Sequence, residues 1–437
     1  MQALVTAPGP QSGIPGLGGH TPRPDGDAET PPAAVVESRP APLAAAPWVV
    51  STYFAQGLPY SIVHQVSAQL FTALGASLGA IGLTSLYGLA WNLKFAWSPL
   101  VDRFGTTRRW LWVVQAALGV SIGLLAWPAG RGDLVVVARA LVLVALLAAT
   151  HDIAIDGFYI RGLGKSDQAA LAGVRVVAYR VALLTGKGLL VALAGWTSWF
   201  WCFFAAGAIL LALSALHAFL LPKPSEDERR ARGGERGTTR THFVEAFRTF
   251  LGQERIALTL GFLLLYRAGD ALMFAMNIPF LARLGLGTAE QGMLSGVGGT
   301  LAFAAGSMAG AALIARRGLR RMLVPIAAVQ SLAIPLYVWL AWAQPTLIWV
   351  GVVVLAEQIA NGIGTAAFVV FIMQRCFGGY KASHFAMASA LMSVAATACG
   401  SASGYIAEYV GFTAFFALAF VVSVPGVMLA RWVPTET

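Results

Sequence analysis

The sequence LVVVARALVLVALLAATHDIAIDGF, residues 134–158, decides the fold. It is long and apolar enough to cross a lipid bilayer as a helix, which takes about twenty apolar residues. Two aspartates, Asp152 and Asp156, nevertheless lie near its end. Soluble domains carry roughly 25% charged residues, whereas this chain of 437 residues is 11% charged and 57% hydrophobic. We therefore expect lipid to cover most of its exterior.

Similar apolar segments recur along nearly the whole chain and predict an all-α membrane protein. Six of them precede a basic linker over residues 222–255, and six follow it. This is the layout of the major facilitator fold, with two six-helix bundles, residues 47–221 and 256–433, around a central cavity. The predicted spans lie near residues 48–73, 79–100, 110–128, 134–158, 168–194, 197–221, 256–282, 290–315, 321–342, 345–374, 382–407 and 412–432.

Residues 1–46 have a different composition from the rest of the chain. They are rich in Pro, Gly and Ala and have no apolar periodicity. Such a segment cannot bury enough apolar surface to offset its ordering entropy, so we expect a disordered tail. It lacks the basic start and apolar run of a cleavable signal peptide. Membrane insertion is therefore expected to begin with the first span.

The basic residues predict the orientation in the membrane. With a cytoplasmic N-terminus, the loops that face the cytoplasm hold nearly all the loop Lys and Arg residues, whereas the opposite loops hold only Arg131 and Arg283. Cytoplasmic loops are the ones enriched in Lys and Arg, so we expect both termini in the cytoplasm. The net charge of +10 then reflects topology, and we expect no nucleic-acid partner.

Ionisable groups inside a bilayer are costly and usually face a cavity or a partner. Asp152 and Asp156 are four residues apart and therefore share one face of the fourth span. The fifth span carries Arg175, Arg180 and Lys187. These acids and bases are either a buried ion-pair network that fixes helix packing or a site for proton coupling and anion binding.

Other charged residues within the spans also have both a structural and a functional interpretation. Lys94 either reaches the cytoplasmic interface or binds a substrate anion. Arg267 and Asp270, three residues apart in the seventh span, are expected to pair with each other. Glu357 shares a helical face with Asn361 and has no basic partner in its own helix. It is either a second proton carrier or a satisfied structural acid. His64 and His384 are expected to be hydrogen-bonded packing residues.

The loop after the second span combines an acid with several bases, Asp102, Arg103, Arg108 and Arg109. Either it clamps neighbouring helices in one access state, or it only marks the cytoplasmic side. Small-residue faces, such as the one with Gly306 and Gly310, are expected to allow close helix packing.

Motifs of other protein classes are missing from the sequence. It has no phosphate-binding loop that ends in Lys-Ser or Lys-Thr, no His-Glu-x-x-His and no Gly-x-Ser-x-Gly elbow. Cys202, Cys376 and Cys399 fit no metal or redox spacing. We therefore expect no ATP, metal or cofactor and no enzymatic activity. A non-transporting membrane sensor and a lipid-handling enzyme are the alternatives from other classes.

Four segments together resemble AmpG-like permeases. They are YFAQGLPY at 53–60, WNLKFAWSPLVDR at 91–103, HDIAIDG at 151–157 and AYR at 178–180. His151 departs from the family's pattern, in which Gln commonly precedes the first Asp. The resemblance implies a secondary transporter of the bacterial inner membrane that imports anhydromuropeptides with protons. Related branches carry acetyl-CoA or siderophores, and a siderophore or drug-like solute is the alternative substrate.

The resemblance and the charges together predict roles for particular residues. We expect a monomer in the lipid bilayer that is driven by the proton gradient and binds a small solute. Proton coupling is assigned to Asp152, Asp156 and Glu357. Gating is assigned to Asp102, Arg103, Arg108 and Arg109. Substrate binding is assigned to Lys94, Arg175 and Arg180 for anionic groups, to Tyr53, Tyr60 and Trp91 for sugar rings, and to Gln56 and Tyr179.

Overall fold

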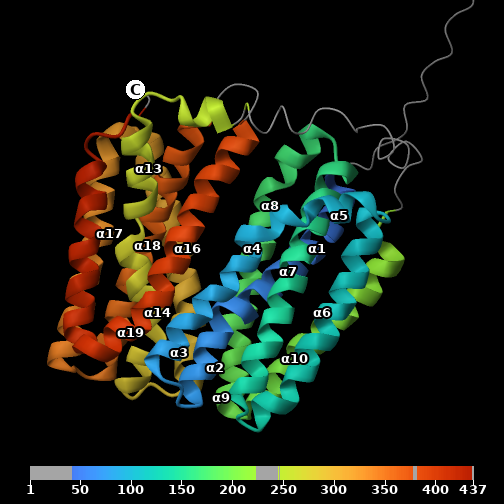
Figure 1. Ribbon diagram of the computed structural model, residues 1–437, viewed down its shortest axis with the longest axis horizontal. Coiled ribbons are helices and arrows are strands. Elements are labelled where there is room, and N and C mark those ends of the chain that lie inside the picture. Colours follow the sequence, from blue (N-terminus) through green and yellow to red (C-terminus); the bar gives the residue numbers. More distant parts are fainter. Residues whose placement is uncertain (1–41, 223–244, 246, 377–380, 436–437) are drawn as a thin grey trace, which may run out of the picture. The chain divides into compact units, whose positions relative to one another are not determined.

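The computed structural model describes residues 42–222, 245, 247–376 and 381–435, and every regular element in these ranges is a helix (Figure 1). All of them belong to one unit, residues 41–437. Most of the predicted tail, and most of the predicted linker over 222–255, lie outside the described residues. The predicted boundaries of the two bundles therefore remain predictions.

The first six predicted spans are all helical. Asp133 begins α7 by accepting a hydrogen bond from the amide of Val136, and Thr106 begins α6 in the same way. The elements are α1 Pro42–Ser61, η1 Ile62–Val66, α2 Ser67–Ala73, α3 Leu78–Leu83, η2 Thr84–Gly88, α4 Leu89–Leu93, η3 Lys94–Ala96, α5 Ser98–Arg103, α6 Thr107–Gly130, α7 Leu134–Gly162, α8 Lys165–Leu184, η4 Thr185–Leu190, α9 Val191–Trp196 and α10 Trp199–Leu220.

The last six predicted spans are helical as well. The eleventh and twelfth run together as α19 and are separated at Gly411, whose φ of 77° breaks the helix. The elements are α13 Ile256–Leu265, α14 Ala268–Arg283, α15 Thr288–Gln291, η5 Gly292–Gly298, α16 Gly299–Arg317, α17 Leu319–Ala343, α18 Leu347–Gln374 and α19 Lys381–Leu429.

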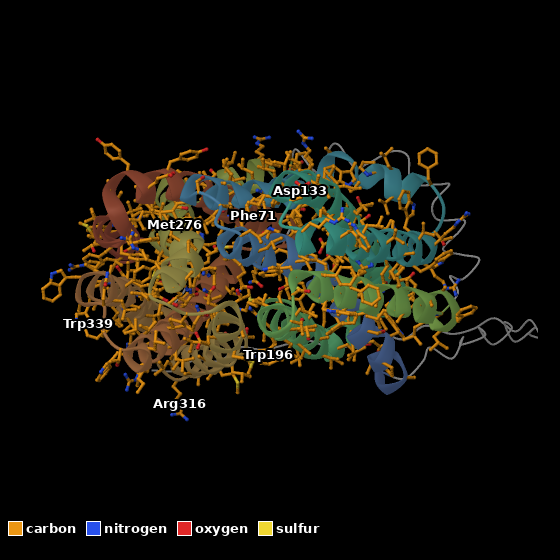
Figure 2. The ribbon with its side chains drawn as sticks, turned by 90° about the horizontal axis from the view of Figure 1, so that it is seen from below. Phe71, Asp133, Trp196, Met276, Arg316 and Trp339 are labelled. Atoms are coloured by element: carbon orange, nitrogen blue, oxygen red, sulfur yellow. The ribbon has the colours of Figure 1, made fainter. Side chains whose placement is uncertain are left out.

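The outer surface suits a lipid environment. Nine helices of the described chain are long and apolar enough to cross a membrane, with α19 counted once. Large apolar side chains point outward, among them Leu124 at 70% and Phe219 at 83% exposure. Trp339 projects from the C-terminal half (Figure 2), and Trp342 lies exposed nearby on the same helix. Tryptophan is typical of the membrane–water interface.

Within each half, glycines bring helices into main-chain contact. A Cβ atom on Gly207 of α10 would lie 2.6 Å from the Cα atom of Gly123 in α6. On Gly306 of α16 it would overlap the carbonyl of Ile359 in α18, and on Gly310 it would lie 2.8 Å from the carbonyl of Ile363. The prediction that Gly306 and Gly310 allow close helix packing is therefore confirmed.

The two halves touch along a glycine seam at one end of the helices, the end that carries the loops at 74–77 and 284–287. Here a Cβ atom on Gly296 of η5 would overlap the main chain of Lys187 and Gly188 in η4. On Gly404 of α19 it would overlap the main chain of Leu78 in α3. We call this end the sealed end, because side chains cannot be inserted there without parting the halves.

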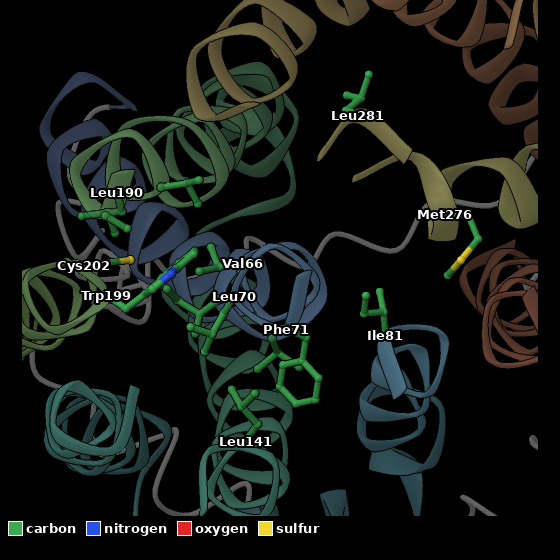
Figure 3. Close-up of a cluster of buried hydrophobic side chains, with 14 of the residues drawn as sticks. Val66, Leu70, Phe71, Ile81, Leu141, Leu190, Trp199, Cys202, Met276 and Leu281 are labelled. Carbon is green, nitrogen blue, oxygen red and sulfur yellow. The ribbon is translucent and has the colours of Figure 1, made fainter. Parts of the chain in front are cut away.

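An apolar cluster supports the seam. It combines Leu70 and Phe71 of α2 and Ile81 of α3 with Met276 and Leu281 of α14. Figure 3 shows Ile81 beside Met276, at the boundary between the two halves. Buried apolar contact across this boundary stabilises the closed seam.

Gly296→Val is expected to part the seam, because overpacking of a tight contact costs about 1–3 kcal/mol. The measurement is the labelling rate of Thr397→Cys, in a cysteine-free background, by an impermeant maleimide added from the sealed end. We expect the rate to rise about tenfold or more. Gly173→Val is the matched control, since a Cβ atom on Gly173 meets no other atom within 4 Å. Unchanged labelling in the Gly296 variant would contradict the seam.

Candidate functional site

Asp152 of α7 joins three spans. Its carboxylate accepts hydrogen bonds from Nζ of Lys94 and from Nε2 of Gln56 in α1. The Lys94 side chain is 35% exposed and the Asp152 side chain 13% exposed. Charge-assisted contacts of this kind are the stronger hydrogen bonds of proteins. The sequence left two roles open for Lys94, at the cytoplasmic interface or in substrate binding. The structure shows a third role, in which Lys94 is the counter-charge of Asp152.

A break in the second span positions Lys94. The span changes there from α4 into the short 3-10 helix η3 before α5 begins. Just beyond η3, the indole nitrogen of Trp97 donates to Oγ1 of Thr150 in α7, at 3.1 Å. Two side chains of this segment thus hold it against α7, close to Asp152.

Asp156 has a second, separate set of partners one turn further along α7. The hydroxyl of Tyr53 donates to Oδ1 of Asp156 at 3.0 Å. Nη1 of Arg175 in α8 donates to the same hydroxyl oxygen at 3.3 Å. The guanidinium also lies over the rings of Tyr53 and Tyr159, at 4.9 Å and 5.4 Å from their centroids. Tyr53 therefore links the acid of the fourth span to a base of the fifth.

An aromatic wall adjoins the Asp152 site. Tyr60 stacks on His64 with ring centroids 4.0 Å apart, and the edge of Trp91 meets Tyr60 at 5.3 Å. Tyr179 completes the wall at 5.9 Å from Tyr60. Tyr60 follows Gln56 by one turn of α1, so the wall begins one turn from the carboxylate of Asp152.

The wall faces a cavity of about 500 Å³ that is lined by both halves. Its N-terminal side includes Tyr60, His64, Arg180 and Lys187. Its C-terminal side includes Arg267, Asn277, Phe303, Gln358 and Asn361. Of the predicted substrate-binding residues, Tyr60 and Arg180 line this cavity. Trp91 and Tyr179 contact Tyr60 but do not line the cavity themselves. Lys94 and Gln56 bond to Asp152, Tyr53 bonds to Asp156, and Arg175 bonds to the Tyr53 hydroxyl.

The C-terminal half buries two acids of its own. Glu357 is 1% exposed and accepts a hydrogen bond from Nε2 of Gln358 at 2.9 Å. Asp270 is 4% exposed and accepts from Nε2 of Gln330 in α17. Among the described residues, neither acid forms an ion pair.

Arg267 does not form the expected pair with Asp270. Its guanidinium donates to Oγ1 of Thr365 at 2.8 Å and to Oδ1 of Asn361 at 3.1 Å, both in α18. A spacing of three residues would place Arg267 and Asp270 side by side on a helix. In the structure, however, Arg267 bonds to polar groups of α18 and Asp270 bonds to a polar group of α17.

The predicted gating residues fall at the opposite end from the seam. Arg108 of α6 donates to the carbonyls of Leu221 and Ala218, where α10 ends. Arg109 is exposed, and only the main chain of Asp102 and Arg103 is described. The proposed clamp therefore remains a prediction.

Several members of the site were not predicted from the sequence, among them His64, Phe303 and Gln330. His64 was expected to be a packing residue; its Nδ1 does lie 3.2 Å from the carbonyl of Tyr60, but the ring also lines the cavity. Its spacing of four residues from Tyr60 was the available signal. Phe303 and Gln330 carried no signal, because their positions depend on contacts between distant helices.

A membrane protein whose two six-span halves share one polar cavity is, as a class, a solute transporter. The comparison with protein families agrees, and the chain belongs to the Major Facilitator Superfamily, whose model matches residues 49–377. It is a multi-pass membrane transporter, and the predicted fold class is confirmed.

Within this superfamily, the chain is similar in sequence to anhydromuropeptide permeases. The chain is 30% identical over 386 residues to the anhydromuropeptide permease of Escherichia coli (strain K12), across 86% of this chain and 77% of the relative. The predicted resemblance to AmpG-like permeases is thereby confirmed.

Solved structures show the same fold. A D-xylose–proton symporter matches with a TM-score of 0.67 and 11% identity over 89% of this chain and 96% of its own. A bacterial homologue of the lysosomal transporter Spinster matches with a TM-score of 0.65 and 16% identity over 90% of this chain and 97% of its own. At such identities the likeness concerns the fold alone.

Lys94→Ala is expected to lower the free energy of unfolding by about 1–3 kcal/mol, because it leaves the Asp152 carboxylate without its counter-charge. Because Lys94 is partly exposed, this loss of stability is expected to be smaller than the loss on breaking a fully buried ion pair. Asp152→Asn should cost less in the Lys94→Ala background than alone. Denaturant unfolding of the four proteins in detergent measures this coupling, and strictly additive effects would contradict the pair.

Proposed function

We propose that the protein imports a muropeptide-like solute, an anhydro-sugar peptide or a related anion, together with protons by alternating access. One observation carries this proposal. The cavity between the halves has an aromatic wall suited to sugar rings and basic side chains suited to anions, and the half-buried Asp152 lies one helical turn from this wall. The similarity to an anhydromuropeptide permease supports the substrate class.

Asp152 is the proposed site of proton exchange. Protonation would remove the charge that holds Lys94 and Gln56, and with it the contact that joins α1, η3 and α7. Asp156 would respond in the same way through Tyr53 and Arg175. Glu357, buried in the other half without a basic partner among the described residues, is the further proton candidate.

The proposed location is the bacterial inner membrane, with both ends of the chain in the cytoplasm. The charge distribution supports this orientation, since Arg108, Arg316 and Arg321 lie at the end opposite the seam. The seam would then close the cavity toward the periplasm. Gating by Asp102, Arg103, Arg108 and Arg109 would act at the cytoplasmic end. We expect a monomer that uses the proton gradient without ATP.

Uptake of labelled N-acetylglucosaminyl-anhydro-N-acetylmuramyl tripeptide into energised membrane vesicles tests the proposal. We expect saturable uptake that collapses when a protonophore dissipates the gradient, because the solute would move only with protons. Vesicles with inserted protein but no uptake would refute the muropeptide assignment. Uptake of a siderophore or a drug-like compound by the same vesicles would then identify the alternative solute. Uptake that is insensitive to the protonophore would refute proton coupling.

Tyr60→Ala is expected to raise the KM for the disaccharide peptide roughly three- to tenfold with a smaller change in kcat, because loss of one aromatic contact costs about 0.5–1.5 kcal/mol. Trp342→Ala is the matched control, since Trp342 is 78% exposed on the outer surface. Initial rates of uptake over a range of solute concentrations measure both constants. An equal KM in the two variants would contradict the role of the wall.

A further inference from the structure

We propose that Arg180, Lys187 and Arg267 form a subsite that binds the carboxylate groups of a peptide solute and draws the two halves together around it. This inference rests on the proposed function and assigns the peptide part of the solute to a particular region of the cavity. The sequence raised an anion-binding role for the fifth-span bases, Lys187 among them, but assigned no substrate contact to Lys187 or Arg267 in particular.

The three cations line the cavity without an acidic partner. They are the charged side chains of its wall, and no Asp or Glu of the described chain lines it with them. Among the described residues, the ion pairs involve Lys94 and Arg255 instead. Asp270 and Glu357 are buried outside this lining and bonded to side-chain amides, so they attract Arg267 and Lys187 from a distance without forming ion pairs.

These cations repel one another. Arg180 is close enough to interact unfavourably with both Arg267 and Lys187, and Glu357 offsets part of this repulsion at Lys187. Like charges in a membrane-embedded cavity are costly and are usually retained for function. A bound anion between them removes this repulsion, whereas an uncharged solute does not.

Neutral groups hold the guanidinium groups in position. Asn361 and Thr365 orient Arg267 with two hydrogen bonds, which leaves further N–H donors of its guanidinium available. Arg180 lies over the ring of Phe303 at 4.6 Å from the ring centroid, across the boundary between the halves. Neither contact neutralises the positive charge, so both groups stay available for a carboxylate.

Unpartnered polar groups in the same wall point independently to a peptide. Oε1 of Gln69 and Oγ of Ser295 are buried, and neither has a hydrogen-bond partner in the described chain. Gln69 belongs to the N-terminal half and is 4% exposed, whereas Ser295 belongs to the C-terminal half. Buried polar atoms are nearly always satisfied. The N–H groups of a peptide would satisfy these acceptors while its carboxylates meet the cations.

The subsite also explains how binding would favour closure. Arg180 and Lys187 belong to the N-terminal half and Arg267 belongs to the C-terminal half. A solute with two carboxylates would bridge them, and its attraction to both sides would be largest when the halves approach. A ligand shifts a conformational equilibrium only through such a difference in affinity.

The first test compares two ligands on the purified full chain in nanodiscs. One is anhydromuramyl tripeptide with free carboxylates, and the other is the same peptide with its carboxylates amidated. We expect the wild type to bind the free form about ten- to a hundredfold more tightly, as expected for hydrogen bonds to charged groups. Arg267→Gln and Lys187→Gln should remove most of this preference and leave binding of the amidated form unchanged.

Arg139→Gln is the matched control, because Arg139 is an exposed residue of α7 outside the cavity. Arg267→Lys should retain part of the preference, which would separate charge from folding defects. Equal losses for both peptides, or a wild type that does not distinguish them, would overturn the subsite while leaving muropeptide transport intact.

A second test separates failure of the subsite from failure of the proposed function. If the wild type binds neither peptide, citrate and pyrophosphate serve as probes of thermal stability. A rise in Tm of the wild type, absent in the Lys187→Gln/Arg267→Gln variant, would keep the anion subsite and refute the muropeptide assignment. Stabilisation by pyrophosphate alone would replace carboxylate with phosphate and overturn the peptide assignment. No stabilisation by either anion would overturn the subsite.

Discussion

The contact of Asp152 with Lys94 and Gln56 is the constraint on which the N-terminal half depends. A carboxylate deep in a lipid-covered protein is tolerated only with partners, and here the partners come from α1 and from the broken second span. Asp156, on the next turn of α7, also has polar partners, because Tyr53 donates a hydrogen bond to it and accepts one from Arg175. Helices that must satisfy a shared charge cannot move independently, so a change in that charge acts on all of them.

The two halves meet at one end of the helices, next to the cavity. Main-chain contacts at Gly296 and Gly404 close the sealed end, together with the apolar cluster that includes Ile81 and Met276. The cavity next to it is lined by cations, amides and aromatic rings from both halves. Events at the cavity and at the seam are therefore coupled through η4 and η5, which contribute to both.

Much of this was predictable from the sequence. Apolar run length predicted twelve spans, and all of these segments are helical in the described chain, nine helices of which are long and apolar enough to cross a membrane. The spacing of Asp152 and Asp156 predicted their shared face. Contacts between distant segments were not predictable. Lys94 meets Asp152 because η3 interrupts its span, and Arg267 bonds to α18 in place of Asp270 because Asn361 and Thr365 lie opposite it. Such pairings depend on helix depth and rotation, which periodicity alone does not fix.

Proton flux measured beside solute exchange tests the central claim, that the charge of Asp152 couples protons to movement of the halves. Proteoliposomes with wild-type protein should take up protons when labelled anhydromuropeptide is added, and should also exchange it against preloaded solute. Asp152→Asn, which cannot gain or lose a proton, should retain the exchange and lose the proton uptake. Solute-driven proton uptake at the wild-type ratio by this variant would contradict the account.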